Sequence, residues 1–201
     1  MRYGDFDTLC EGLDYAAQGD TGFNYFSGKA ELLSTLSYKE LREQAMEMAK
    51  RLVPFAQKDA RIGIAAVSTP EFAVMFFACQ YAGIVAAPVP LPVTLGGRGS
   101  YERQLQRMAE TGDFHALFTP ASMEPIMSSA LNDLSIPVLT FDEVSELPKG
   151  KDVRPFGKDD LCYIQYSSGS SSSPKGVIGT QASVCANCHG ITKDGLKITG
   201  E

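Results

Sequence analysis

Two short apolar runs on either side of an apolar helix constrain the fold of this chain most. Residues 60–67 and 84–89 are almost wholly apolar and do not alternate with polar side chains. Such runs are typical of strands buried on both faces of a parallel sheet. Residues 71–81 between them are apolar nearly all round and predict a helix that packs on more than one side. Strand, helix and strand in this order predict a βαβ unit with a right-handed crossover.

The alternation of strand and helix signals continues along the chain. Ser37 and Glu40 form a capping box, and the helix that follows carries an apolar stripe of Leu41, Ala45, Met48 and Leu52. Further helices are predicted at 101–110, 120–131 and 181–189, and further strands at 116–119, 137–141 and 161–166. We therefore expect an α/β fold with a doubly wound, mainly parallel sheet and flanking helices.

Composition limits the classes of function. At 201 residues, 44% of them hydrophobic, the chain is long enough to bury a substantial core. The formal net charge of −6, with scattered Lys and Arg, argues against nucleic acid or an anionic membrane surface as the main partner. The most apolar stretch, 72–93, is interrupted by glycine and prolines and predicts core rather than a membrane span. Residues 1–7 show no secretory signal, so we expect a cytoplasmic protein.

Five cysteines in a chain without a visible secretory signal predict free thiols. Cys185, Cys188 and His189 match the C-x-x-C-H form of a haem attachment site, and a C-x-x-C pair can also be redox-active or half of a zinc site. Haem attachment requires export, and a zinc site lacks a second pair of ligands because His115 is the only other histidine. We therefore interpret the pair as small buried thiols on a helix and expect no metal site.

A segment rich in hydroxyl groups and glycine follows the strand predicted at 161–166. Residues 163–177 read Y-I-Q-Y-S-S-G-S-S-S-S-P-K-G-V. Small residues allow successive backbone N–H groups to turn inward on an anion, serine hydroxyls add donors, and a lysine adds positive charge. We predict a loop between two strands that binds the phosphates of ATP through Ser167, Ser168, Gly169, Ser170, Ser171, Ser172, Lys175 and Gly176. Residues 175–179 are a poor helix start, so no helix dipole is expected to contribute.

Two other interpretations of this segment account for it less well. A flexible Gly/Ser linker has no reason to follow a strand directly or to end in Pro-Lys-Gly before more apolar residues. The nucleotide loop G-x-x-x-x-G-K-[ST] shares the spacing of Gly169 and Lys175. It fails at two places, because Pro174 replaces the second glycine and Gly176 replaces the magnesium-binding Ser/Thr.

The loop resembles the phosphate-binding loop of the adenylate-forming superfamily, typically written Y-T-S-G-[ST]-T-G-x-P-K-G-V. That superfamily includes acyl-CoA synthetases, peptide-synthetase adenylation domains, fatty acyl-AMP ligases and luciferase. Upstream segments support the resemblance in the expected order: L-S-Y-K-E-L-R at 36–42, I-G-I-A-A-V-S-T-P-E-F at 62–72 and Y-A-G-I-V-A-A-P-V-P-L-P at 81–92. The resemblance implies the N-terminal part of the adenylate-forming fold. Its expected divisions are a first α/β subdomain at 1–141, a connecting segment at 142–160, and the start of a second subdomain at 161–201, where the loop strand begins a second sheet.

The resemblance also implies an activity. Members join a carboxylate to the α-phosphate of ATP, with Mg²⁺ present, and release pyrophosphate from the acyl-adenylate. By similarity, the loop lines the β- and γ-phosphates and Lys175 steadies the leaving pyrophosphate. The catalytic lysine, magnesium ligands and acyl pocket of relatives lie beyond the position of Glu201. We therefore expect an N-terminal fragment that has no catalytic residue, is inactive alone, and exposes an apolar face and strand edge that favour self-association.

The branch within the superfamily is a finer prediction. Gln165 and the S-G-S at 168–170 look more like fatty acyl-AMP ligases, which pass a fatty acid to an acyl carrier protein. An acyl-CoA synthetase, with CoA as acceptor, and a peptide-synthetase adenylation domain stay open. A non-catalytic nucleotide-binding or interaction module is the alternative of another class. Relatives often carry a Thr-His pair after the loop, whereas this chain has Thr180 and Gln181, so any contact made by that histidine is not expected here.

Overall fold

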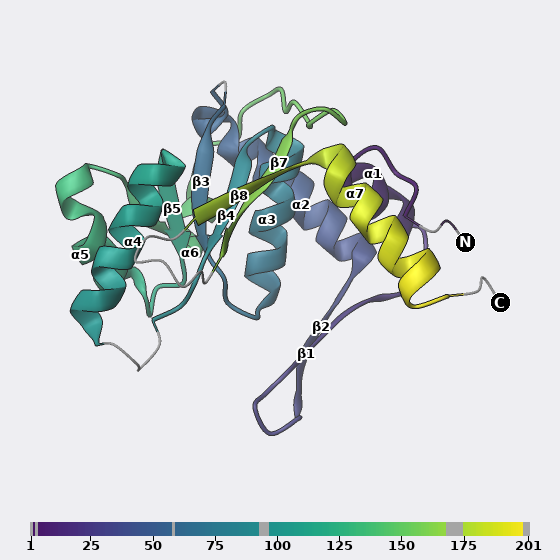
Figure 1. Cartoon of the computed structure of the whole chain (residues 1–201), viewed down its shortest axis with the longest axis horizontal. Helices are drawn as coiled ribbons and strands as arrows, with labels where there is room; N and C mark the ends of the chain where they lie inside the picture. Colours follow the sequence, from purple (N-terminus) through teal and green to yellow (C-terminus); the bar gives the residue numbers. More distant parts are fainter. Residues whose placement is uncertain (1, 3, 58, 93–96, 168–174, 199–201) are drawn as a thin grey trace.

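The computed structural model describes residues 2, 4–57, 59–92, 97–167 and 175–198. Within these residues six strands form one sheet, in the order β6-β5-β3-β4-β7-β8 (Figure 1). The neighbouring strands from β6 to β7 run parallel, and β8 runs antiparallel to β7. Their bounds are β3 Arg61–Ala65, β4 Val85–Val89, β5 Ala116–Thr119, β6 Val138–Thr140, β7 Leu161–Ser167 and β8 Lys175–Thr180. The predicted α/β fold with a mainly parallel sheet is confirmed.

Helices cover both faces of this sheet. One hydrophobic cluster packs α2 and α3 against one face, and a second packs α4 and α5 against the other. The helices are α1 Leu9–Ala16, α2 Tyr38–Leu52, α3 Pro70–Ala82, α4 Arg98–Gly112, α5 Glu124–Leu131, α6 Phe141–Glu146 and α7 Gln181–Gly190. Short turns of 3₁₀-helix at Val53–Phe55 and Asn132–Leu134, and of π-helix at Ile191–Gly195, extend three of them.

The ends of α2 and α3 carry capping residues, and those predicted for α2 are found there. The Ser37 hydroxyl accepts the backbone N–H of Glu40 at 3.2 Å, and the Glu40 carboxylate accepts the N–H of Ser37 at 3.0 Å. This capping box begins α2, whose Leu41 and Leu52 are fully buried. Helix α3 begins at Pro70 and ends at Ala82, and the residue that caps it, Gly83, adopts the left-handed conformation with φ of 70°.

Three expectations differ from the structure. Helix α5 begins at Glu124 rather than at residue 120, because residues 121–123 form a turn. The polar connection at 142–160 contains most of α6, which a capping box between Thr140 and Glu143 begins. The expectation that the loop strand opens a second sheet is wrong, because β7 pairs with the free edge of β4. The proposed subdomain divisions at 1–141, 142–160 and 161–201 stay a prediction.

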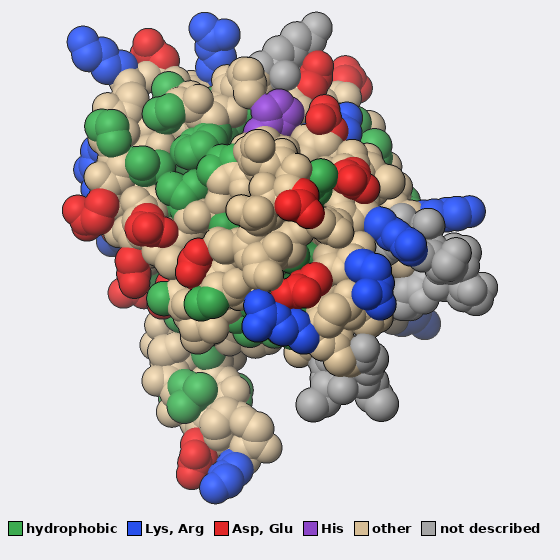
Figure 2. Space-filling model, turned by 90° about the vertical axis from the view of Figure 1, so that its left-hand side faces the viewer, with side chains coloured by type: hydrophobic (Ala, Val, Ile, Leu, Met, Phe, Trp, Pro, Cys, Tyr) green, Lys and Arg blue, Asp and Glu red, His purple; other side chains and the backbone are tan. Residues whose placement is uncertain are grey.

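Two N-terminal features were not predicted from the sequence. Helix α1 packs against α2, α3 and α7, and strands β1 (Gly22–Phe26) and β2 (Leu32–Ser37) form a hairpin that projects from the body of the molecule (Figure 1). On the face shown in Figure 2, acidic and basic side chains are interspersed. None of the helices described here is both long enough and apolar enough to cross a bilayer.

Candidate phosphate-binding site

The predicted phosphate loop starts and ends at the carboxyl edge of the parallel sheet. Strand β7 ends at Ser167, and β8 begins at Lys175, its direct partner across the antiparallel pair. The Ser167 hydroxyl donates to the Lys175 carbonyl at 3.4 Å, and both residues are exposed. The structure thus brings Ser167, Lys175 and Gly176 together at the base of the loop. Ser168, Gly169, Ser170, Ser171 and Ser172 lie outside the described residues, so their contacts with phosphate stay a prediction.

Tyr166 anchors the end of the loop strand to α4. Its hydroxyl donates to the Met108 carbonyl at 2.7 Å, and its ring lies 6.3 Å from that of Phe114. Burial raises the pKa of Tyr166 to about 12. Gly112 makes room for this contact, because a Cβ at that position would lie 2.3 Å from the Tyr166 hydroxyl. The base of the loop is therefore fixed against the α4 side of the sheet.

A cavity of about 380 Å³ adjoins the base of the loop. It opens where parallel strands β3, β4 and β7 end, which is the edge at which open α/β sheets usually bind ligands. Its lining combines prolines and aromatic rings with a few amide and hydroxyl groups: Ala66, Pro88, Val89, Pro90, Gln104, Met108, Tyr163, Gln165, Tyr166 and Ser167. A ligand held by the loop can extend into this cavity.

The start of α7 offers its first N–H groups to protein acceptors. The Gln181 N–H donates to the Asp160 carbonyl and the Ala182 N–H to the Lys158 carbonyl, each at 2.9 Å. The Ser183 N–H donates to the Thr180 hydroxyl at 3.2 Å. These donors are the ones that usually bind an anion at a helix N-terminus. Thr180, which caps α7, pairs with Leu161 at the end of the β7–β8 pair that lies away from the loop, so no contribution of this helix start to anion binding at the loop is assigned.

Gln181 occupies the position at which relatives in the resemblance often carry a histidine. Its side chain is 1% exposed, donates to the Gln80 side-chain oxygen at 2.6 Å, and accepts the Leu9 N–H at 3.0 Å. Gln80 is fully buried in α3, where the sequence showed only an apolar helix. A lone polar residue inside an otherwise apolar helix was the signal that could have identified it.

A second hollow, of about 390 Å³, lies beside the amino-terminal half of α3. Aromatic rings dominate its lining, which consists of Phe23, Tyr25, Ala66, Val67, Ser68, Thr69, Phe72, Ala73, Phe76 and Phe77. Ala66 lines both this hollow and the cavity beside the loop, so the two are neighbours. The hollow presents an apolar surface that is suited to hydrocarbon rather than to phosphate.

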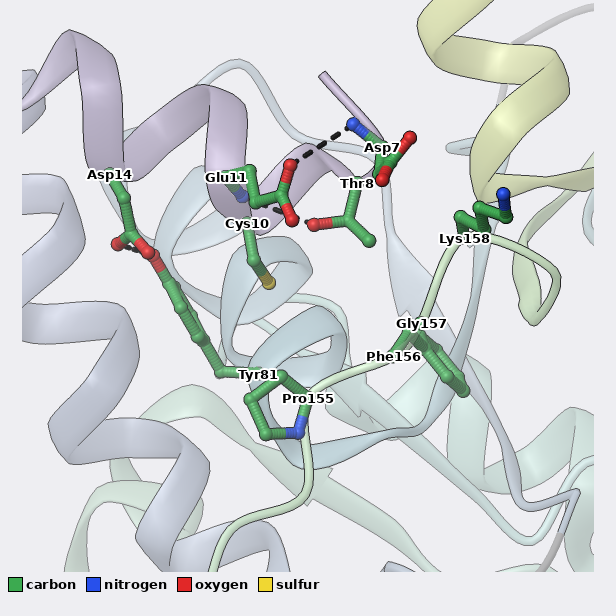
Figure 3. A pocket seen from close by; sticks show the side chains of 10 residues that line it. All are labelled: Asp7, Thr8, Cys10, Glu11, Asp14, Tyr81, Pro155, Phe156, Gly157 and Lys158. Atoms are coloured by element: carbon green, nitrogen blue, oxygen red, sulfur yellow. Dashed lines mark hydrogen bonds between the residues drawn. The ribbon is translucent and has the colours of Figure 1, made fainter.

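A third cavity is lined by residues of α1 and the segment before it, by Tyr81 of α3 and by residues 155–158 (Figure 3). Asp14 accepts hydrogen bonds from the Tyr81 hydroxyl at 2.7 Å and from Arg42 at 2.6 Å, and Glu11 accepts the Asp7 N–H at 3.1 Å. Burial raises the pKa of the Cys10 thiol, which keeps it protonated. The partners of these groups explain their positions without a ligand.

The C-x-x-C pair shows no sign of a metal site. Cys185 is buried as expected, and burial raises the pKa of its thiol to about 11. Cys188 is exposed, contrary to the prediction of two buried thiols, because the core does not reach as far along α7 as this residue. Among the described residues, no group of three or more His, Cys, Asp or Glu side chains is placed to hold a metal ion.

Comparison with known proteins adds independent evidence. A family model described as AMP-binding enzyme matches residues 20–199. A putative acyl-CoA synthetase of Caulobacter vibrioides is 36% identical over 202 residues, which cover 98% of this chain and 35% of that protein. A medium-chain-fatty-acid–[acyl-carrier-protein] ligase of Moorena producens is 27% identical, with 99% and 36% covered.

Solved structures show the same similarity. One from a study of fatty acyl-adenylate ligases of E. coli and L. pneumophila has a TM-score of 0.94 and 36% identity, and covers 100% of this chain and 37% of that one. An adenylation domain of a keto acid-selecting peptide-synthetase module, 22% identical with a TM-score of 0.81 and 100% and 38% covered, shows the shared fold alone. This chain spans about a third of the length of the relatives it matches.

Proposed function

The chain belongs to the AMP-binding enzyme family, and from this premise we propose that it is the part of an ATP-dependent ligase that grips the phosphates of ATP. In that reaction a carboxylate attacks the α-phosphate, an acyl-adenylate forms, and pyrophosphate leaves. The observation that carries the proposal is the pairing of Ser167 with Lys175 at the carboxyl edge of a parallel sheet, on either side of the serine-rich segment 168–174.

The chemistry that this site would supply is electrostatic. An anionic carboxylate approaches an anionic phosphate, and negative charge accumulates on the leaving oxygens, so fixed N–H dipoles and cations stabilise the transition state. We propose that Lys175, at the base of the loop, offsets the charge of the departing pyrophosphate. We propose that Ser168, Gly169, Ser170, Ser171 and Ser172 line the β- and γ-phosphates, together with Ser167 and Gly176 at the base.

The Mg²⁺ that the resemblance implies usually takes only one or two carboxylates from a protein and is otherwise held by water and the phosphates of the substrate. Enzymes of this family use ATP, typically with Mg²⁺, yet the described residues present no cluster of carboxylates that could hold the ion. Oxygen ligands are what Mg²⁺ requires. We therefore assign no magnesium ligand to the described residues and derive no step through the metal. The groups that we assign to ATP are the loop and Lys175.

A fatty acid is the carboxylic acid that we propose as substrate, with an acyl carrier protein as acceptor. Relatives named for fatty acids support this choice, as do Gln165 and the S-G-S at 168–170. The alternatives are CoA as acceptor, which the similarity to a putative acyl-CoA synthetase favours, and an amino-acid-activating or keto-acid-activating domain. A cytoplasmic location is the setting that we propose for each of them.

The relatives are about three times as long as this chain, so we propose that catalysis needs residues equivalent to the rest of their length. The 201-residue polypeptide is then inactive alone. Pyrophosphate exchange measured on this polypeptide with a panel of fatty acids should show no turnover. Turnover in that assay would contradict this part of the proposal. A non-catalytic module that retained only the phosphate loop is the alternative of another class. It would bind polyphosphate but stay inactive even within a longer gene product.

Titration with tripolyphosphate tests the site directly on the 201-residue chain. Lys175→Ala should weaken binding about tenfold or more, because a charge-assisted contact is lost. Lys29→Ala is the matched control, since it removes the same charge from the exposed turn of the β1–β2 hairpin. Equal affinity of the two variants would contradict the proposal. In a gene product long enough for pyrophosphate exchange, Lys175→Ala should slow exchange about a hundredfold.

A further inference from the structure

The strand that leads into the phosphate loop contains a β-bulge near its start. Leu161 of β7 pairs with Thr180 of β8, but the next pair joins Tyr163 to Gly179. One residue of β8 is therefore opposed by two of β7, and Cys162 is the extra residue. Such bulges break the ladder locally and redirect the side chains that follow.

The side chains on either side of the bulge confirm this change of direction. The Cys162 sulfur lies 3.6 Å from the Gln80 side-chain oxygen, and the Tyr163 ring lies 6.0 Å from that of Phe76, so both consecutive residues face α3. Ile164 and Tyr166 then belong to the opposite cluster, with α4. In a regular strand consecutive side chains alternate, so the extra residue determines which face every later side chain takes.

Hydrogen bonds through two buried glutamine side chains connect the bulge to α7 and α1. The Gln80 amide donates to the Cys162 carbonyl at 3.0 Å. Gln181 donates to the Gln80 oxygen at 2.6 Å, and its own oxygen accepts the Leu9 N–H at 3.0 Å. Both glutamines are at most 1% exposed. Each of these groups would carry a desolvation penalty if its partner were removed.

We propose that Gln80 is a positioning residue for the phosphate loop: by holding the Cys162 carbonyl of the bulge, it sets the β7–β8 register that places Ser167 opposite Lys175. A shift of one residue would turn Tyr166 away from α4 and would separate Ser167 from Lys175. Gln181 supports Gln80 from the start of α7, so the two strands that flank the loop are tied to one buried point. The role of Gln80 in the β7–β8 register depends only on the fold. Its effect on phosphate binding rests on the proposed function.

Hydrogen–deuterium exchange tests the register, because local opening is measured residue by residue. Gln80→Met keeps the length of the side chain and removes its amide. It should speed exchange at 164–167 and 175–178 about tenfold more than in the neighbouring pair β3–β4. Tyr81→Phe is the matched control, since it removes one partly buried hydrogen bond, to Asp14, from the adjacent residue of α3. Tyr81→Phe should change the hydrogen-exchange rates of β7–β8 and β3–β4 equally.

Equal acceleration of both strand pairs in Gln80→Met would overturn the proposal, because Gln80 would then be a general stabiliser. Unchanged exchange at 164–167 and 175–178 of the β7–β8 pair would overturn it too. If Gln80→Met does not fold, Gln181→Met is the second variant. This variant keeps the hydrogen bond from Gln80 to Cys162. It should therefore accelerate hydrogen exchange less than Gln80→Met does, and only in β7 and β8. Acceleration spread over the whole sheet in Gln181→Met would equally overturn the proposal.

Tripolyphosphate titration of the same variants separates this inference from the proposed function. Gln80→Met should weaken binding although it touches no residue of the loop, and Tyr81→Phe should not. If the wild-type chain binds no tripolyphosphate, the proposed function fails while the exchange result still decides the role of Gln80. A third outcome is possible if the wild-type chain binds tripolyphosphate. If Gln80→Met then binds it equally well although exchange in β7–β8 is faster, Gln80 stabilises the strand pair without positioning the site, and the inference is wrong.

Discussion

The side-chain amide of Gln181 donates to the side-chain oxygen of Gln80 across 2.6 Å, between two residues that lie a hundred and one positions apart in the chain. Gln80 also donates to the Cys162 carbonyl, so a single buried residue of α3 contacts the strand before the phosphate loop and the helix after it. The loop is anchored on both sides although the residues that anchor it lie outside the loop motif.

Replacing Gln181 by Met should lower the free energy of unfolding by about 1–3 kcal/mol, because the Leu9 N–H and the Gln80 oxygen both lose a buried partner. Gln104→Met is the control, since Gln104 is exposed on α4 and should change stability by less than about 0.5 kcal/mol. Urea unfolding followed by circular dichroism measures both. A loss no greater than that of the control would show that the buried amides contribute little to stability.

Gly112 and Gly190 form a second matched pair, because each is the last residue of a helix. Gly112→Ala would place a methyl group 2.3 Å from the Tyr166 hydroxyl and should cost about 1–3 kcal/mol as Tyr166 is displaced. Gly190→Ala meets nothing within 4 Å and should be neutral or stabilise by up to about 1 kcal/mol. Thermal unfolding of the two variants distinguishes overcrowding from helix propensity. Equal effects would be inconsistent with the close approach of Tyr166.

The raised pKa of Tyr166 predicts a pH dependence of stability. A free tyrosine titrates near pH 10, and burial raises the pKa of Tyr166 to about 12 in the folded chain. The contribution of this protonated tyrosine to the free energy of unfolding is therefore fully present below pH 10 and is lost as the pH rises from 10 to 12. Wild type should be more stable than Tyr166→Phe by about 1 kcal/mol at pH 8, from the bond to Met108, and this difference should shrink and then reverse across this window. A constant difference from pH 8 to 12 would contradict the assignment.

Strand β8 predicts self-association of the 201-residue chain. It lies at an edge of the described sheet, and its Val177 and Ile178 are 61% and 48% exposed. Unpaired strand edges with apolar side chains favour pairing with another chain. Sedimentation velocity should show concentration-dependent association that Ile178→Lys reduces. Leu196→Lys, which changes a 67% exposed side chain outside any strand, should have little effect. A wild-type chain that stays monomeric at high concentration would refute this prediction.

The sequence by itself determined the fold class and the place of the loop. Unbroken apolar runs such as 60–67 predict buried parallel strands, and capping residues such as Ser37 predict helix starts, because both effects act over a few neighbouring residues. The serine-rich segment between two strands followed from the same local reasoning. Two strands flank it as expected, although β7 continues one residue beyond the predicted strand, to Ser167, and Lys175 and Gly176 already belong to β8.

Only the tertiary structure decided how these elements meet. Which edge of the sheet receives β7, that Cys162 forms a bulge, and that Gln80 and Gln181 bind one another depend on contacts between residues distant in sequence. A bulge adds one residue without changing the composition of its strand, and a buried glutamine in an apolar helix has a role only when its partners are known. Register and burial arise from the packing of the whole sheet, so local sequence patterns do not specify them.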